Sequence, residues 1–371
     1  MNLHFFIDEK VVPRIVDIYN SVCGDNNKYV VIVPYDNYTP KYVKKETANM
    51  IITTYKSNEF NAFIGELSQY KYIVLHGLTS NLIDFINHHP HSGYWWRAWG
   101  GDLYNTYLEY KGYNCYYDKD EALKFMGIIS FRHYLLKPYY RLKELLYLRK
   151  KEKAINGISY ISAIKGDIKL LKEFCSKAKH IQYKYGGGYY PINTIVSPKL
   201  SEKSLGSNII IGNSAYAECN HVEIFKCLAD LELGDRKVIV PLSYGDIAPY
   251  IVAKGNEYLK GNFQPVTQFL PINDYNELLL SAQTFIYNSY RQMAFGNIVV
   301  ALYLGGTVFL NEKNSLVEHF RDLGCHFFLI KELPERLNYR LTETEKNDNR
   351  RILLDNYSEE NLLKIIKETL S

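Results

Sequence analysis

Short apolar runs alternate with segments of helical periodicity along this chain, and the alternation occurs twice. In the first half, strand-like runs at 29–34 and 70–77 are separated by polar or helical stretches. A later run at 157–164 is followed by the amphipathic segment 168–178, and the alternation restarts at 208–214. This order of strand and helix predicts parallel sheets with helices on both faces.

The length of the chain favours two such sheets over one. A chain of 371 residues is long for a single hydrophobic core and suits two domains. Glycines, prolines and serines with little periodicity separate the two halves, and we interpret Gly186–Gly188 there as a turn. We therefore predict an α/β protein with two Rossmann-like domains facing each other across a cleft. The expected ranges are 1–190, a linker at 191–207, and 208–371, and it stays open whether the last helix packs on the first domain.

Composition excludes several classes of protein. The net charge of +4 is too small to indicate nucleic-acid binding. The six cysteines show no metal-binding or CxxC spacing, which favours free thiols in a reducing compartment. The start of the chain has no signal-peptide pattern, and no stretch has the roughly 20 apolar residues of a membrane span. The expected location is cytoplasmic, and 34 tyrosines suit a sugar or nucleotide cleft.

The second domain contains two candidate phosphate-binding loops. In the first, Gly212 lets the backbone approach a ligand while Asn213 and Ser214 offer side-chain hydrogen bonds. In the second, Arg291 and Gln292 follow a strand, and Gly296–Asn297 is expected to open a helix, with Asn297 as its N-cap. A helix N-terminus and an arginine together suit a phosphate. The alternatives are ordinary turn chemistry for the first loop and a solvated arginine in the second.

A second unusual feature lies in the first domain. The three tryptophans of the chain fall within five positions and are followed directly by two glycines and an aspartate: Trp95, Trp96, Trp99, Gly100, Gly101 and Asp102. Rigid aromatic surface beside a flexible backbone and a carboxylate is typical of a polar-ligand pocket. The alternative is a core strand running into a turn, with the aspartate as a structural cap.

Histidines give two further hypotheses. His76 follows a strand of the first domain, where it could act as a general base or bind a sugar or phosphate, although capping the strand is the common alternative. The run at 87–93 contains several histidines but no cysteine or carboxylate in register, so we predict a loop there rather than a zinc site.

The segment 131–153 carries eight Lys or Arg residues against Glu144 and Glu152, with leucines and tyrosines between them. This pattern is typical of a helix lying on an anionic membrane surface. A solvated helix packed on its own domain fits the pattern equally well.

Taken together, these segments resemble glycosyltransferase family 56, which includes the TDP-N-acetylfucosamine:lipid II N-acetylfucosaminyltransferases of enterobacterial common antigen assembly. The stretch from Trp99 to Tyr104 is similar to the family's Trp-Gly-Ala-Asp-Leu-Tyr signature, with Gly101 in place of Ala. Further similarities to the family are, in chain order, Gly166-Asp167, Gly212-Asn213-Ser214 with downstream Asn220-His221, Pro241 and Tyr244, and Arg291, Gln292 and Gly296 before Asn297, where the family usually has Thr.

The resemblance implies a GT-B architecture in which the second domain binds a nucleotide sugar, with a TDP-sugar favoured. It also implies a polyprenyl-diphosphate-linked glycan acceptor at the first domain, beside the three tryptophans and Gly100–Gly101, and a peripheral location on the cytoplasmic face of the bacterial inner membrane. Asp102 and then His76 are the expected catalytic residues. No Asp-x-Asp pair stands in a fitting loop, so we predict transfer without a metal. The alternatives are a nucleotide-sugar epimerase and a non-catalytic nucleotide-sugar binding protein.

Overall fold

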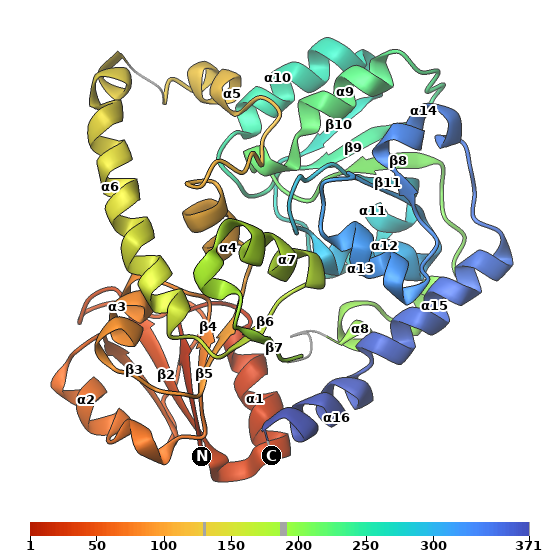
Figure 1. Cartoon of the computed structure of the whole chain (residues 1–371). Helices are drawn as coiled ribbons and strands as arrows, with labels where there is room; N and C mark the ends of the chain where they lie inside the picture. Colours follow the sequence, from red (N-terminus) through yellow and green to blue (C-terminus); the bar gives the residue numbers. More distant parts are fainter. Residues whose placement is uncertain (129–130, 186–190, 371) are drawn as a thin grey trace. The chain divides into compact units, whose positions relative to one another are not determined.

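The computed structural model describes residues 1–128, 131–185 and 191–370, without the side chains of 131–135, Asn193 and Pro198. The chain forms two compact units (Figure 1). The first unit comprises Met1–Tyr113, Arg141–Tyr189 and Glu359–Ser371. The second comprises Asn114–Tyr140 and Tyr190–Ser358.

The first unit is built on a seven-stranded sheet in the order β3-β2-β1-β4-β5-β6-β7, and the pairings between its strands are parallel. The strands are β1 (Asn2–Phe6), β2 (Asn27–Val33), β3 (Met50–Thr54), β4 (Tyr72–His76), β5 (Tyr94–Arg97), β6 (Tyr160–Ser162) and β7 (Gln182–Tyr183). The winding reverses between β1 and β4, so the loops that follow these two strands diverge at the carboxyl edge of the sheet. Ligands of open α/β sheets bind at such a reversal.

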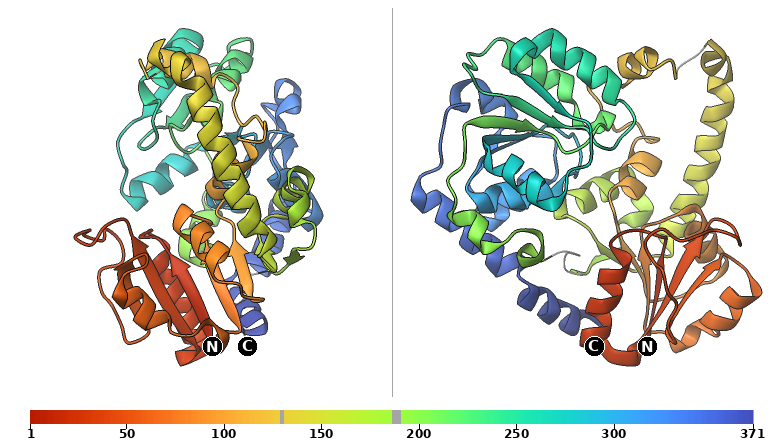
Figure 2. Two further views of the ribbon diagram at one scale, coloured as in Figure 1. Left: turned by 60° about the vertical axis from the view of Figure 1, so that its left-hand side comes forward. Right: turned by 180° about the vertical axis from the view of Figure 1, so that it is seen from behind.

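Helices cover both faces of this sheet (Figure 2). Its longer helices are α1 (Val12–Cys23), α2 (Asn58–Ile64), α3 (Ser80–His88), α7 (Lys165–Phe174) and α16 (Glu359–Leu370), and α6 (Phe131–Asn156) belongs to it from Arg141 onward. Neighbouring side chains of β1 face opposite ways, as the period of two in a strand requires. Phe5 packs on Phe60 of α2 and Phe85 of α3, whereas Phe6 belongs to the core beneath α1 and α16. Leu362 of α16 is buried in that core.

The second unit has a six-stranded parallel sheet in the order β10-β9-β8-β11-β12-β13. Its strands are β8 (Asn208–Ile211), β9 (Val238–Pro241), β10 (Phe263–Val266), β11 (Ala282–Tyr287), β12 (Thr307–Leu310) and β13 (Phe328–Leu329). The winding reverses between β8 and β11, where Ile211 lies opposite Ile286.

The helices of the second unit pack around this sheet and around one another. The main ones are α5 (Lys119–Phe125), α8 (Ile192–Ile195), α9 (His221–Ala229), α10 (Ala248–Leu259), α11 (Ile272–Leu280), α12 (Phe295–Leu304), α13 (Leu316–Leu323), α14 (Leu333–Arg336) and α15 (Glu343–Tyr357). One core joins Val222 and Phe225 of α9, Tyr250 of α10 and the strand residues Ile209 and Val240. The apolar helix α12 packs against β11, β12 and α15.

The observed units differ from the expected ranges in three places. Glu359–Ser371, expected within 208–371, belongs to the first unit, which was the possibility left open for the last helix. Residues 114–140 were expected in the first domain, yet they lie in the second unit, because the Tyr117 N–H donates to Asn220 and Asp118 accepts from the Tyr250 hydroxyl. The expected linker 191–207 also lies in the second unit, where α8 packs on α12 and Arg350 donates to the Ser201 carbonyl. The Gly186–Gly188 turn lies outside the described residues.

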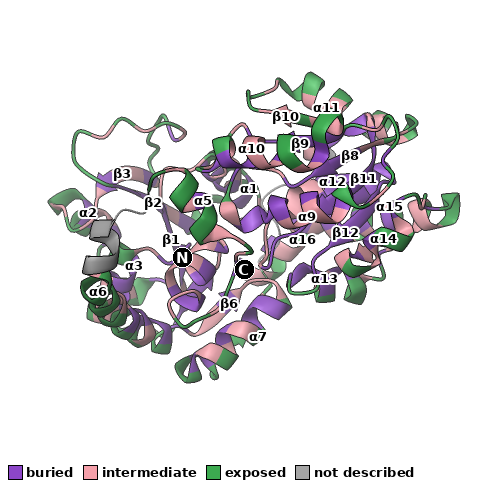
Figure 3. Cartoon of the chain, turned by 90° about the horizontal axis from the view of Figure 1, so that it is seen from above, coloured by how far each residue is buried: buried purple, intermediate pink, exposed green. Residues whose placement is uncertain are grey.

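Helix α6 contains the basic and aromatic segment singled out in the sequence. Figure 3 shows much of its described surface as exposed. The exposed large apolar side chains are Tyr139, Tyr140, Leu142, Leu145 and Leu146, with exposed fractions between 40% and 56%. Leu148 and Lys151, on the opposite side of the helix, are buried in the first unit. Within the described ranges, no helix has the length and apolar character that crossing a membrane requires.

Candidate functional site

The two predicted phosphate-binding loops of the second unit meet at the reversal of its sheet. Gly212–Ser214 follows β8, and the loop from Asn288 to Ala294 follows the adjacent strand β11. The Gly212 N–H donates to the Ile286 carbonyl over 2.9 Å, which joins the two loops at their base. The carboxyl ends of parallel strands at a reversal form the ligand crevice of doubly wound folds.

Side chains from the β8 and β9 loops meet at this edge. Asn213 donates from Nδ2 to the Tyr244 hydroxyl over 2.9 Å. Tyr244 is 50% exposed, and its ring lies edge-on to the ring of Tyr216, with 6.0 Å between centroids. Gly245 has φ +113°, and a Cβ there would lie 2.4 Å from the Ala215 carbonyl carbon, so the two loops approach as only glycine permits. The sequence predicted Asn213 and Tyr244, and the structure brings them together.

Tyr275 of α11 extends this group toward α12, although it was not among the residues predicted from the sequence. Its hydroxyl donates to Asn297 Oδ1 over 3.4 Å. Burial, with a smaller contribution from Tyr244, raises the pKa of Tyr275 to about 12, so the hydroxyl keeps its proton. Nothing in the periodicity of 272–280 distinguishes this tyrosine from a packing residue, because its role depends on contacts distant in sequence.

The start of α12 differs from the prediction. We expected Asn297 as the N-cap, but the N-cap is Ala294, which has φ +61°, and the helix begins at Phe295. Asn297 therefore lies in the first turn, where its side chain accepts the bond from Tyr275. A Cβ on Gly296 would meet nothing within 4 Å, so space remains open beside this helix N-terminus. The unpaired N–H groups of a first turn attract anions.

Arg291 is held beside this helix by a carboxylate that the sequence did not reveal. Its Nη2 lies 3.5 Å from Glu218 Oε1, and both side chains are about nine-tenths buried. Its Nη1 donates to the backbone carbonyl of Gln292. The ion pair compensates the buried guanidinium and fixes its position. Cys219 links the same turn to Ser214, with 3.4 Å between Sγ and Oγ, so the Gly212–Ser214 and Arg291–Gln292 loops share one support.

A buried polar network lies beneath the β11 loop. Asn288 donates to Glu223 Oε2 over 2.6 Å and accepts from Asn311 over 2.7 Å. Asn220 donates to the Asn288 carbonyl, and the Tyr290 hydroxyl donates to Glu223. Since a satisfied buried network specifies one arrangement of its members, it holds the loop before Arg291 rigid.

In the first unit, Asp102 lies in the short helix α4 (Gly101–Leu103) after β5 and binds three N–H groups. Oδ2 accepts from Leu78 N over 2.8 Å and from Trp96 Nε1 over 2.6 Å, while Oδ1 accepts from Trp99 N over 2.8 Å. The carboxylate thus joins the loops that follow β4 and β5. This geometry favours the interpretation of Asp102 as a structural cap over its prediction as a base, because a base needs a free oxygen facing the hydroxyl.

Two of the three tryptophans belong to the core rather than to a pocket wall. Trp95 and Trp96 are 1% and 0% exposed, and Trp95 donates to the Ser162 hydroxyl over 2.7 Å. Trp99 is half-buried and lies 3.8 Å from where a Cβ on Gly77 would stand. Gly100 has φ +85°, which explains the glycine. Of this cluster, Trp99 and the space beside Gly101, where a Cβ meets nothing, are available to a ligand.

His76 lies at the end of β4 and is buried. Its Nε2 lies 3.2 Å from His4 Nδ1, and the other His4 nitrogen lies 3.2 Å from Asn27 Oδ1. Its ring stacks on Phe6 at 3.9 Å. Burial, with His4 and Arg97 as further causes, holds the pKa of His76 well below its ordinary value. A histidine that is 1% exposed does not reach a substrate, so the predicted catalytic role of His76 lacks geometric support.

Lys151, part of the predicted membrane segment, is also a core residue. Its Nζ donates to the Asp102 carbonyl and to Thr106 Oγ1. Burial lowers the pKa of Lys151 to about 8, against the raising effect of the Asp102 charge. This lysine fastens α6 to the loop of Asp102, so it does not belong to the solvated basic face that the sequence suggested.

The first unit has a cavity of about 400 Å³ at the reversal of its sheet, between the ends of β1 and β2 and the start of α3. Ile7, Pro34, Tyr38 and Asn81 contribute to its lining. Asp8, also in the lining, accepts the backbone N–H groups of residues 41–43. Burial opposes its ionisation, but these bonds outweigh it and hold the Asp8 pKa below its usual value. The cavity is therefore a candidate ligand site of this unit.

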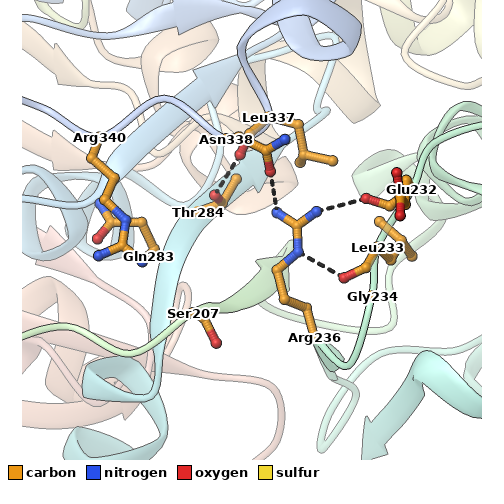
Figure 4. Close-up of a pocket in the computed structure, with 10 residues that line it drawn as sticks. All are labelled: Ser207, Glu232, Leu233, Gly234, Arg236, Gln283, Thr284, Leu337, Asn338 and Arg340. Atoms are coloured by element: carbon orange, nitrogen blue, oxygen red, sulfur yellow. Dashed lines mark hydrogen bonds between the residues drawn. The ribbon is translucent and has the colours of Figure 1, made fainter.

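A second cavity, of about 390 Å³, lies at the opposite, amino-terminal edge of the second unit's sheet (Figure 4). Arg236 crosses it and donates to the carbonyls of Glu232 and Leu233 and to Asn338 Oδ1, each over 2.8 Å. The guanidinium therefore serves to tie chain segments together. Ligands of such folds bind at the other edge of the sheet.

In the part of the chain that the structure describes, no three His, Cys, Asp or Glu residues are grouped as a metal site would require. No family model matches the chain.

Solved structures similar to the whole chain include HepE of Anabaena in complex with UDP and glucose, at 14% identity and TM-score 0.61, covering 100% of this chain and 99% of that one. Sucrose-phosphate synthase of Thermosynechococcus elongatus is 10% identical with TM-score 0.65, over 99% of this chain and 97% of that one. WaaG, a glycosyltransferase of lipopolysaccharide biosynthesis, is 12% identical with TM-score 0.51, over 99% and 94%. The likeness shows the fold: two parallel-sheet α/β domains of the GT-B type, which confirms the predicted fold class.

Proposed function

We propose that this protein is a glycosyltransferase that takes its sugar from a nucleoside-diphosphate donor bound by the second unit. One observation carries the proposal: Asn213, Tyr244, Arg291 and the open first turn of α12 meet at the reversal of that unit's sheet. A diphosphate fits a helix N-terminus beside a fixed guanidinium. The similar HepE structure in complex with UDP supports a nucleotide there.

The finer proposal concerns the substrates. The similarity to family 56 supports an N-acetylfucosamine-like amino or deoxy sugar, a TDP donor and a polyprenyl-diphosphate-linked glycan acceptor. We place the acceptor at the cavity of the first unit, near Asn81 and the start of α3. Asp102 contributes by holding the Trp99 loop in place, since three N–H groups occupy its carboxylate.

Calorimetry with UDP and TDP, followed by a donor screen against lipid-linked acceptors, tests this function. Binding of one nucleotide and transfer from its sugar conjugate is the expected result. If the protein binds neither UDP nor TDP, the proposal that it is a transferase using these donors is wrong. Incubating the donor sugar without acceptor separates the main alternative, because conversion of the sugar to its epimer would establish an epimerase.

Metal-independent transfer is part of the proposal, because the N–H groups of the α12 N-terminus and of the Arg291 guanidinium can hydrogen-bond a diphosphate without a divalent cation. Transfer is expected to continue in excess EDTA. Activity that EDTA abolishes and magnesium or manganese restores would contradict it.

We also propose that the protein docks peripherally on the cytoplasmic face of the bacterial inner membrane through α6. The exposed side chains of that helix support this: Tyr139, Leu142 and Leu146 are followed along the chain by Arg149 and Lys153. Apolar insertion and attraction to anionic headgroups then act together.

A further inference from the structure

His221, the first residue of α9, is a buried histidine without a hydrogen-bond partner among the described residues. It is 2% exposed, and both ring nitrogens are buried and unpaired. Burial lowers its pKa to about 3, so the ring is neutral at physiological pH. The ring packs near Phe225 one turn further along the helix. A buried polar group without a hydrogen-bond partner destabilises a fold, so the presence of a histidine at this position needs an explanation. The explanation lies in what the Nε2 side of the ring contacts.

That ring edge lies directly against Gly212. A Cβ on Gly212 would stand 2.7 Å from His221 Nε2 and 3.4 Å from the two neighbouring ring carbons. Gly212 also has φ +66°, a conformation that side-chain-bearing residues rarely adopt. Glycine is therefore required here twice, once by the backbone conformation and once by the imidazole.

We propose that His221 is a positioning residue for the donor site, which sets the backbone of Gly212–Ser214 through the shape of its neutral ring. The inference rests on the proposed function, since a nucleoside diphosphate is the ligand whose phosphates this loop would receive. The Ile286 carbonyl holds Gly212 from the side of β11, and the imidazole supports it from the side of α9. With both contacts in place, the loop has one position, and Asn213 keeps its bond to Tyr244.

The mechanism is one of geometry rather than of proton transfer. The ring neither exchanges a proton near neutral pH nor reaches solvent, so its effect on the donor loop is exerted through its contact with Gly212. Displacing a binding group by about an ångström weakens ligand binding strongly. Removing the ring should therefore raise the donor KM and the nucleotide Kd, while kcat at saturating donor changes little.

The test compares His221→Ala, His221→Phe and a control, His326→Ala, which alters a partly exposed histidine of the same unit. The affinity for UDP and TDP is measured by calorimetry at pH 6, 7 and 8, well below each Tm. We expect His221→Ala to weaken the nucleotide about tenfold at every pH, and His326→Ala to have no effect. His221→Phe keeps a planar ring without unpaired nitrogens, so it should bind within threefold of wild type and melt no lower.

A second variant pair tests the contact itself. Gly212→Ala should weaken nucleotide binding more than tenfold, and adding His221→Ala should recover part of that loss, because the new methyl group then has room. The matched control is Gly234→Ala, because Gly234 shares the positive φ, at +57°, and its Cβ would meet nothing within 4 Å.

The outcomes separate the two levels of the argument. A wild-type protein that binds neither nucleotide overturns the proposed function together with this inference. Nucleotide binding by wild type that is unchanged in His221→Ala overturns the positioning role alone. Loss of binding in His221→Phe as large as in His221→Ala shows that the nitrogens act instead of the ring shape. If the changes in nucleotide-binding free energy from Gly212→Ala and His221→Ala are strictly additive, the two residues do not interact and the proposed contact is wrong.

Discussion

The carboxyl edges of the two sheets use polar residues in different ways. In the first unit, His76 is buried against His4, and Asp102 is occupied by three N–H groups. In the second unit, Tyr244 is half exposed, and the first turn of α12 has open space beside Gly296. The polar groups at the end of β4 and after β5 therefore form a structural network beside the first unit's cavity, whereas those at the reversal of the second unit's sheet stay available to a ligand. The topology of the sheet predicts where a ligand binds, but the burial and hydrogen bonds of the side chains there decide whether they can contact it.

The largest expected effect concerns acid, and it sharpens this comparison. Burial lowers the pKa of His4 to about 3, so the unfolded chain binds more protons than the native one below pH 6.5. The stability of the first unit is therefore complete above pH 6.5 and is lost as the pH falls toward 3, by roughly 5 kcal/mol for His4 alone. Tryptophan fluorescence reports this unit, because all three tryptophans lie in it.

Urea unfolding at pH 7.5, 5.5 and 4.5 measures that loss. As the pH falls, the midpoint of the fluorescence transition, which reports the first unit, should move to lower urea concentration than the midpoint of the circular dichroism transition, which reports the whole chain. His76→Phe should reduce the dependence on acid, whereas His88→Asn, at an exposed site, should not. Equal acid sensitivity of all variants would show that the buried histidines are not its cause.

The next effect concerns Asp102. Replacing it with Ala removes three hydrogen bonds to a carboxylate, which should lower the free energy of unfolding by about 3–4 kcal/mol. Asp102→Asn should also destabilise the first unit, because its amide presents a donor to N–H groups. Thermal melting and transfer assays on the same samples decide the matter. An Asp102→Asn protein with unchanged Tm and activity reduced about 10²–10⁴-fold would restore the role of general base.

The sequence predicted the fold, and several of the side chains that it singled out lie together in the second unit, for identifiable reasons. Strand and helix periodicity depends on neighbours in the chain, so both parallel sheets could be predicted from it. The loops of Gly212 and Arg291 carry local signals and lie together as expected. Trp95 and Lys151 could not be placed, because burial of an aromatic or basic residue depends on partners such as Ser162 and Thr106 that lie far along the chain. Tyr275 and Glu218 could not be predicted as site residues for the same reason, because their partners Asn297 and Arg291 lie far along the chain.

A smaller effect is expected on nucleotide binding by the second unit, where Arg291 lies at the carboxyl edge of the sheet and Arg236 at the amino edge. Arg291→Ala should weaken UDP or TDP binding by about 2–3 kcal/mol, the scale of a lost hydrogen bond to a charged group. Arg236 lies at the amino edge, where it donates to the carbonyls of Glu232 and Leu233 and to Asn338, so Arg236→Ala should lower Tm and leave the nucleotide affinity unchanged. Calorimetry and thermal melting of both variants separate nucleotide binding from a structural role. An unchanged nucleotide Kd for Arg291→Ala would show that Arg291 does not bind the nucleotide.

The smallest effect concerns α6, where exposed and buried basic residues occur within one helix. Arg149, Lys150 and Lys153 are exposed, whereas Lys151 is buried against Asp102 and must be left intact. Each basic residue near an anionic surface contributes ~1 kcal/mol before the cost of ordering, so changing the three to Glu should weaken vesicle binding about tenfold or more. Leucine and tyrosine insertion is not screened by salt, so wild-type binding should fall with ionic strength without vanishing.

Sedimentation with vesicles of increasing anionic lipid content measures this binding. The control changes Lys169, Lys177 and Lys179 of the same unit to Glu, which alters the net charge equally but leaves α6 intact. If the α6 variant and the control sediment alike, net charge alone governs binding and α6 is not the docking surface. If the α6 variant loses binding while its TDP affinity stays unchanged, the helix acts at the membrane and the second unit's crevice acts on the nucleotide, each through the side chains that folding leaves exposed.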